Sequence, residues 1–183
     1  DGSTSIGQDR QTSGSDVTKQ YDANGDQVFI DVVDVSGNVI GTKPAVVIYV
    51  TSSDSRIGAG SNGEDANLDT NSGVITRLTE QAEGSLVAVD IVRGLARSEE
   101  NHATNGLEVI QELDEQGKLV SERMIVASGG NANTGAPSNN FAGQQETPTS
   151  AAILEVDLDQ LNALGVQTDA DGRQFIYDLP TLN

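Results

Sequence analysis

The sequence predicts a mainly β fold, an antiparallel β-sandwich or jelly-roll-like domain of about eight or nine strands with one short helix at residues 157–164. Two observations lead to this prediction. Small and branched aliphatic residues dominate the apolar set, with three Phe, three Tyr and no Trp, and such residues suit pleated strands. Turn-forming residues also separate short apolar runs along most of the chain, as in sandwich folds.

The length of 183 residues is in the normal range for one domain. Residues 1–20 hold only two aliphatic side chains, Ile6 and Val17, in a Ser/Thr/Gly/Gln background. We therefore expect a polar N-terminal tail there, and a candidate contact between subunits. Residues 21–183 are predicted to form the single sandwich domain, with long polar loops at 52–73 and 128–150.

In the first half of the chain, runs rich in β-branched residues predict strands at residues 27–35, 45–51, 74–78 and 85–93. The run AVVIYVT at 45–51 is apolar at successive positions, so we expect a central strand buried on both faces. Ser36-Gly37-Asn38 predicts a turn after the first run, with a short return strand at residues 39–40.

In the second half, the apolar stretch at 107–127 is interrupted by a turn sequence at 114–117, which predicts an antiparallel hairpin. A helix is the alternative, because Glu, Leu and Gln favour helices, but Gly117 and the β-branched second part favour strands.

The end of the chain predicts a strand at 151–156, followed by the helix. Asp157 would be the N-cap of that helix and Gly165 its C-terminal stop. The sequence Asp-Ala-Asp-Gly at 169–172 predicts a turn into a last strand at 174–179.

Charge and composition exclude several classes of function. The net charge is -18, and only ten residues are Lys or Arg, so nucleic acid and anionic membrane surfaces are not expected partners. We expect no membrane span, since no apolar run reaches about 18 residues. The chain has no cysteine, which excludes disulfides and thiolate metal sites.

The strongest metal-binding pattern is Asp22-Ala23-Asn24-Gly25-Asp26, with Asp31 five residues later. Oxygen ligands at alternate positions of a turn can converge on Ca²⁺, although the EF-hand consensus is not met. A hairpin turn without metal is the alternative reading. Weaker patterns of the same kind occur at Asp69 and Asn71 and at Asp169 and Asp171.

Catalytic motifs are sparse, so we do not expect an enzyme. His102 is the one histidine, no G-x-S-x-G elbow occurs, and the G-x-G-x-x-G at residues 58–63 does not follow a predicted strand. Paired carboxylates remain a route to hydrolysis, because 28 acidic residues are present.

The sequence therefore predicts a secreted or cell-surface structural protein, the self-assembling subunit of a filament, surface layer or particle coat. The chain begins at Asp1 rather than Met, which fits either a mature secreted chain or a trimmed one, and we favour the first. The subunits of this homo-oligomer or polymer would join through terminal segments or strand addition. Phe175, Tyr177 and Leu179, on one face of the last strand, are candidate contact residues. The alternatives are a calcium-stabilised adhesive or matrix-binding module and a carboxylate-dependent hydrolase.

Overall fold

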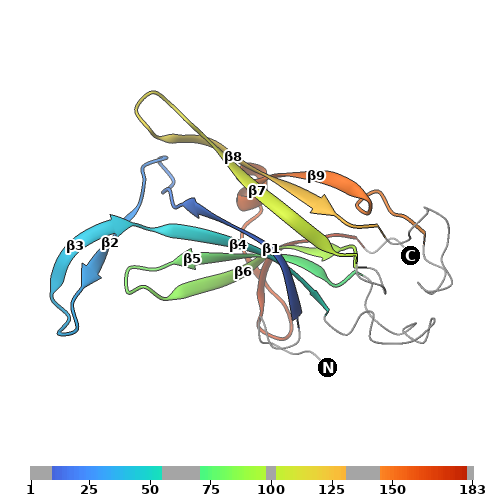
Figure 1. Ribbon diagram of the computed structural model, residues 1–183, viewed down its shortest axis with the longest axis horizontal. Coiled ribbons are helices and arrows are strands. Elements are labelled where there is room, and N and C mark those ends of the chain that lie inside the picture. Colours follow the sequence, from blue (N-terminus) through green and yellow to red (C-terminus); the bar gives the residue numbers. More distant parts are fainter. Residues whose placement is uncertain (1–9, 55–70, 98–101, 131–144, 181–183) are drawn as a thin grey trace.

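The computed structural model describes residues 10–54, 71–97, 102–130 and 145–180. Within these ranges the chain forms eleven strands in three sheets and one short helix (Figure 1). The mainly β class and the single short helix of the sequence analysis are therefore confirmed.

The largest sheet has six strands. In spatial order they are β1 (Arg10–Lys19), β4 (Val46–Asp54), β5 (Gly73–Glu80), β6 (Leu86–Leu95), β11 (Gln174–Asp178) and β10 (Gln167–Thr168). The apolar run predicted at 45–51 is part of β4, an interior strand between β1 and β5. Burial alternates along it, so one face is fully buried and the other is only half-buried, not both buried as expected.

The second sheet contains β7 (Thr104–Leu113), β8 (Leu119–Ser128) and β9 (Ala152–Asp157), and the helix α1 (Leu158–Ala163) follows β9 directly. The hairpin predicted at residues 107–127 is β7 and β8. The predicted cap is also present, since the Asp157 side chain accepts a hydrogen bond from the Gln160 amide.

The third sheet is a separate two-stranded ribbon of β2 (Phe29–Val33) and β3 (Val39–Pro44), which projects from one end of the molecule (Figure 1). Its base is held by the buried Glu80, whose carboxylate accepts hydrogen bonds from the Lys43 ammonium at 2.6 Å and from the Val46 amide at 3.2 Å. The Lys43 hydrogen bond is the main reason that the pKa of Glu80 is lowered.

Two expectations from the sequence were wrong. Residues 10–19, expected in a polar tail, form β1, which pairs antiparallel with β4 over its whole length. Backbone hydrogen bonds make this pairing, so it needs no apolar side chains. The sheet is also mixed rather than antiparallel, because β11 runs parallel to β6. The chain builds the entire second sheet and α1 between these two strands, and such a crossover permits parallel pairing.

The six-stranded sheet and the β7–β8–β9 sheet share one hydrophobic core. Tyr49, Ile75 and Ile91 contribute from the large sheet, Met124 from β8 and Leu158 from α1, and all five are fully buried. The two sheets therefore enclose a single apolar interior, with the helix packed at one end of it.

One side of this interior is closed where β1 meets β7. The Asp16 carboxylate accepts a hydrogen bond from the Val109 amide at 2.8 Å. Gly14 is needed at this junction, because a Cβ there would lie 1.8 Å from the Asn105 carbonyl oxygen. On the other side β9 and β11 are not paired with each other, and α1 packs against both.

Candidate functional site

The Asp-rich turns share one geometry. Four hairpin turns have the sequence Asp-x-x-Gly and begin at Asp22, Asp34, Asp114 and Asp169. In each, one carboxylate oxygen accepts hydrogen bonds from the amides two and four residues later, at 2.8–3.0 Å. Each glycine has a positive φ between 78° and 84°, which glycine adopts without strain.

These hydrogen bonds hold the turns closed, and they stabilise the ionised form of each aspartate side chain. Backbone amide donors, that of Asp26 first, lower the pKa of Asp22. The side chain of Asn38 is the main cause of the lowered pKa of Asp34, and the Arg173 amide has the same role for Asp169. The sequence signal that predicted metal is thus also the signal of this turn geometry.

The residues predicted to bind calcium have other partners as well. Asp26 lies 3.0 Å from the Lys118 ammonium, and Asp31 is exposed on β2 opposite Thr42. Asp169 is bridged by Arg93 at 2.8 Å and by Arg173 at 3.2 Å.

The remaining predicted ligands have these positions. The backbone amide of Asn24 donates a hydrogen bond to the Asp22 carboxylate. Asp171 forms an ion pair with Arg173, and Asn71 lies just before β5. Asp69 lies outside the described residues. Across the four described ranges, no three His, Cys, Asp or Glu side chains group in a way that suits a metal ion. Calcium binding by these turns stays a prediction.

The predicted contact residues fall in different environments. Val17 is exposed on β1, whereas Ile6 is outside the described part of the chain. The Arg93 guanidinium lies over the Phe175 ring, with its Cζ atom 4.6 Å from the centroid of that ring. Leu179 packs against the core, and Tyr177 is 41% exposed. Their role in joining subunits is an open prediction.

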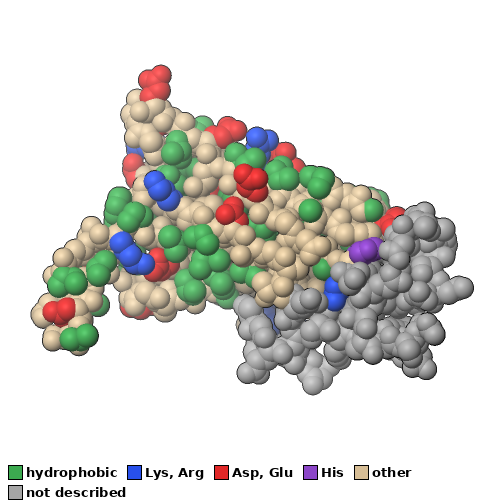
Figure 2. Space-filling model, viewed as in Figure 1, with side chains coloured by type: hydrophobic (Ala, Val, Ile, Leu, Met, Phe, Trp, Pro, Cys, Tyr) green, Lys and Arg blue, Asp and Glu red, His purple; other side chains and the backbone are tan. Residues whose placement is uncertain are grey.

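The β2–β3 ribbon carries an unusual number of exposed apolar side chains. Phe29 and Val33 share one face of β2, and Val39 lies directly opposite Val33 on β3, so all three are on the same face of the ribbon. They are 57%, 56% and 59% exposed. Figure 2 shows apolar side chains along this projecting arm. Both outer edges of the ribbon are unpaired among the described strands.

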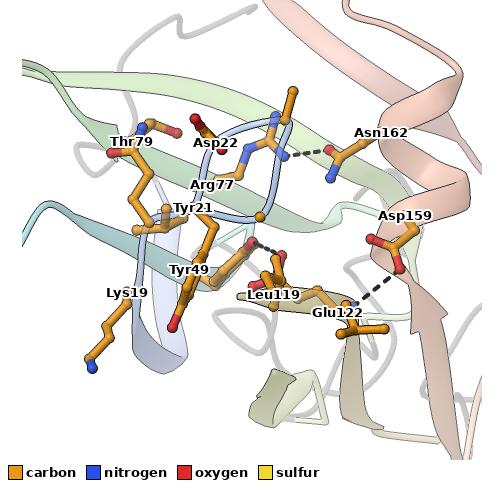
Figure 3. Close-up of a pocket in the computed structure, with 15 residues that line it drawn as sticks. Lys19, Tyr21, Asp22, Tyr49, Arg77, Thr79, Leu119, Glu122, Asp159 and Asn162 are labelled. Carbon is orange, nitrogen blue, oxygen red and sulfur yellow. Dashed lines mark hydrogen bonds between the residues drawn. The ribbon is translucent and has the colours of Figure 1, made fainter. Parts of the chain in front are cut away.

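A polar cleft of about 490 Å³ lies between the two main sheets, close to the 22–26 turn (Figure 3). Tyr49 from β4 and Arg77 from β5 line it on one side, and Glu122 from β8 lines it on the other. Asp159 from α1 contributes a second carboxylate, which accepts a hydrogen bond from the Glu122 amide at 3.2 Å.

Glu122 is a carboxyl group of this cleft whose pKa is raised, whereas that of Asp22 is lowered. Its side chain is partly buried and accepts hydrogen bonds from Gln111 at 2.7 Å and from the Tyr49 hydroxyl at 3.4 Å. Desolvation raises the pKa of Glu122, and the nearby charge of Asp159 raises it further. Burial likewise raises the pKa of the Tyr49 hydroxyl. The cleft therefore holds a carboxyl group that keeps its proton more readily than an exposed glutamate.

Sequence reasoning did not find this cleft, because its residues come from the end of β1, the 22–26 turn, β4, β5, β8 and α1. Of the residues predicted to bind metal, Asp22 is the one that lines it. The comparison with known proteins adds no identification: no family model, curated protein or solved structure matches the chain. No helix among the described residues is long and apolar enough to cross a membrane.

Proposed function

We propose that this chain is an extracellular structural protein, a subunit that assembles with its own copies into a filament, surface layer or particle coat. The observation that carries the proposal is the projecting β2–β3 ribbon. A lone two-stranded ribbon is marginally stable in water, and this one leaves Phe29, Val33 and Val39 exposed on one face. A second protein surface that covers these side chains would remove the cost of exposing them.

The edges of the ribbon support joining by strand addition. Natural proteins usually shorten, cover or charge a free strand edge, since it can pair with another chain. The ribbon has two such edges and few charges, with Asp31 and Lys43 the charged residues within its strands. In this proposal the two main sheets form the sandwich-like framework of a secreted or cell-surface subunit, and the ribbon is its joint.

The terminal segments give less support for the joint. Residues 10–19 pair with β4, and β11 pairs with both β6 and β10. These strands are thus used inside their own chain, and the ribbon is the better candidate for contact between subunits.

The test replaces Val33 and Val39 together by threonine, which keeps the branched shape and the preference for strands but adds a hydroxyl group. Light scattering and electron microscopy should show assemblies of the wild-type chain and mainly monomers of the V33T/V39T variant. The matched control is Val87→Thr, at an exposed position on β6, which should assemble like the wild type. Equal assembly of V33T/V39T and wild type would exclude the ribbon as the joint.

A second candidate function is supported by the cleft of Figure 3, where Glu122 and Asp159 supply two carboxylates. A carboxyl group with a raised pKa near a second carboxyl group is an arrangement that carboxylate-dependent hydrolases use. This candidate predicts turnover of chromogenic glycosides or esters that both Glu122→Gln and Asp159→Asn abolish. Glu83→Gln, on an exposed turn, is the control. No turnover by the wild-type chain would remove this candidate.

A further inference from the structure

The side of the molecule flanked by β9 and β11 contains an apolar groove of about 390 Å³. Leu95 of β6, Leu154 of β9 and Leu161 of α1 line its interior, and Leu164 and Tyr177 lie at its mouth. Leu95 and Leu161 belong to the buried core, whereas Leu164 and Tyr177 are 58% and 41% exposed. The groove thus leads from solvent to the apolar interior between the two sheets.

Two strand edges border this groove. β9 is the outermost strand of its sheet, and among the described strands nothing pairs with its outer edge. β10 pairs with Gln174 and Phe175, so no strand within the described ranges lies beside Tyr177 on that side. An apolar groove beside a free strand edge is a recurrent site for an added segment, because the edge offers backbone hydrogen bonds and the groove takes side chains.

The tip of the β2–β3 ribbon has the matching chemistry. Val33, Val35, Val39 and Ile40 surround the turn, and each of these aliphatic side chains is more than half exposed. The turn aspartate between them, Asp34, already has its carboxylate bonded to backbone amides and to Asn38. An apolar surface could therefore cover the tip without leaving that charge unpartnered.

We infer that the groove between β9 and β11 receives the ribbon tip of a second copy of this chain. The inference rests on the proposed function and names the surface that accepts the joint. The ribbon projects from the end of the molecule opposite to β9 (Figure 1), so a copy cannot fill its own groove. A projection and a receptor at different places on one chain give a head-to-tail contact, which propagates into an open polymer.

The buried area sets the strength of each contact. Burial of one aliphatic side chain removes roughly 60–120 Å² of apolar surface from water, so four of them remove roughly 240–480 Å². A stable interface buries about 800 Å² on each partner. A single contact is therefore weak, and assembly should depend steeply on protein concentration. It should also increase with salt, because the copies, each of charge -18, repel one another less when screened.

The absence of cysteine from the chain allows a direct test by cross-linking. Ile40→Cys marks the ribbon tip and Leu164→Cys marks the mouth of the groove, both at exposed positions. The two variants are mixed at high concentration in 0.5 M salt, oxidised mildly and separated on a non-reducing gel. We expect a disulfide-linked dimer in the mixture, several-fold more abundant than in either variant alone. A chain that carries both substitutions should give a ladder of higher multimers.

The control mixture combines Leu164→Cys with Val87→Cys, an exposed position on β6 that belongs neither to the ribbon strands nor to the lining of the groove. Its yield of dimer defines the background of random collision, and circular dichroism confirms that every variant keeps the β fold. A yield from the Ile40→Cys and Leu164→Cys mixture no higher than this background would overturn the inference.

The possible failures are distinguishable. Efficient dimer formation by Ile40→Cys alone would mean that two ribbons pair with each other, which overturns the groove as receptor but leaves the proposed function intact. A wild-type chain that stays monomeric in light scattering at all concentrations, with or without salt, would contradict the proposed function itself.

Discussion

Replacement of Glu122 by glutamine should make the folded protein more stable at pH 7. Glutamine has nearly the same shape, and it can keep both contacts of Glu122: its oxygen accepts from Gln111, and its amide donates to the Tyr49 hydroxyl. The substitution removes only the negative charge, which is desolvated in the cleft and lies near Asp159. Because the side chain is only partly buried and its charge already accepts two hydrogen bonds, we expect a gain of about 1 kcal/mol, well below the cost of an unpaired buried charge.

The sign of the pH dependence follows from the raised pKa of Glu122. Below the pKa of the unfolded chain the carboxyl group is protonated in both states, so wild type and E122Q should be equally stable. As the pH rises from there through the folded-state pKa, the wild type loses the stability linked to this proton. The advantage of E122Q should therefore appear across that interval and stay constant at higher pH.

Urea unfolding followed by circular dichroism at several pH values measures this difference, and the melting temperature should rise by about 2–4 °C at pH 7. Asp159→Asn is a useful companion, since it removes the second charge and should give a smaller gain. The reasoning is refuted if E122Q is less stable than wild type by the same amount at acidic and neutral pH, because the hydrogen bonds of Glu122 would then outweigh its desolvation.

Three other predictions test the turns and the core. Leu158→Ala should lower the free energy of unfolding by about 2–5 kcal/mol because Leu158 is fully buried; urea unfolding should show this, and a loss below about 1 kcal/mol would contradict the packing. Gly25→Ala should cost clearly more than Gly37→Ala: both have positive φ, but only at Gly25 would a Cβ meet backbone, 2.5 Å from the Leu119 oxygen. Equal costs in thermal melts would argue against that close approach. If the 22–26 turn binds calcium, chelator should lower the melting temperature and Asp26→Ala should remove that sensitivity. A melting temperature that chelator does not change would mean that this turn binds no calcium.

The local elements of this fold were predictable from sequence because their signals are local. The hairpin at 107–127 has its turn and its two apolar runs side by side in the chain, and Asp157 caps a helix that begins at the next residue. A glycine at a fixed offset after an aspartate likewise marks the turn at 169–172. Each of these features depends on residues within a few positions of one another.

The features that were not predictable depend on long-range pairing. β1 is mostly polar, and only its register with β4 shows that it belongs to the sheet. The parallel position of β11 beside β6 has no marker in either strand. The cleft around Glu122 and Asp159 brings together carboxylates 37 positions apart. The apolar pattern of β2 predicted a strand, but it did not predict that Phe29 and Val33 are exposed, because their burial depends on whether another sheet covers β2.

The position of β11 also constrains the order in which the molecule can form. Phe175 pairs with Asp90, so the edge of β6 stays unpaired until β11 is synthesised, about 85 residues later. At ordinary rates of synthesis this interval lasts many seconds. Contacts so distant in sequence also close slowly. During that interval the edge of β6 is open to any neighbouring nascent chain, and a helper that shields it would raise the yield of folded protein.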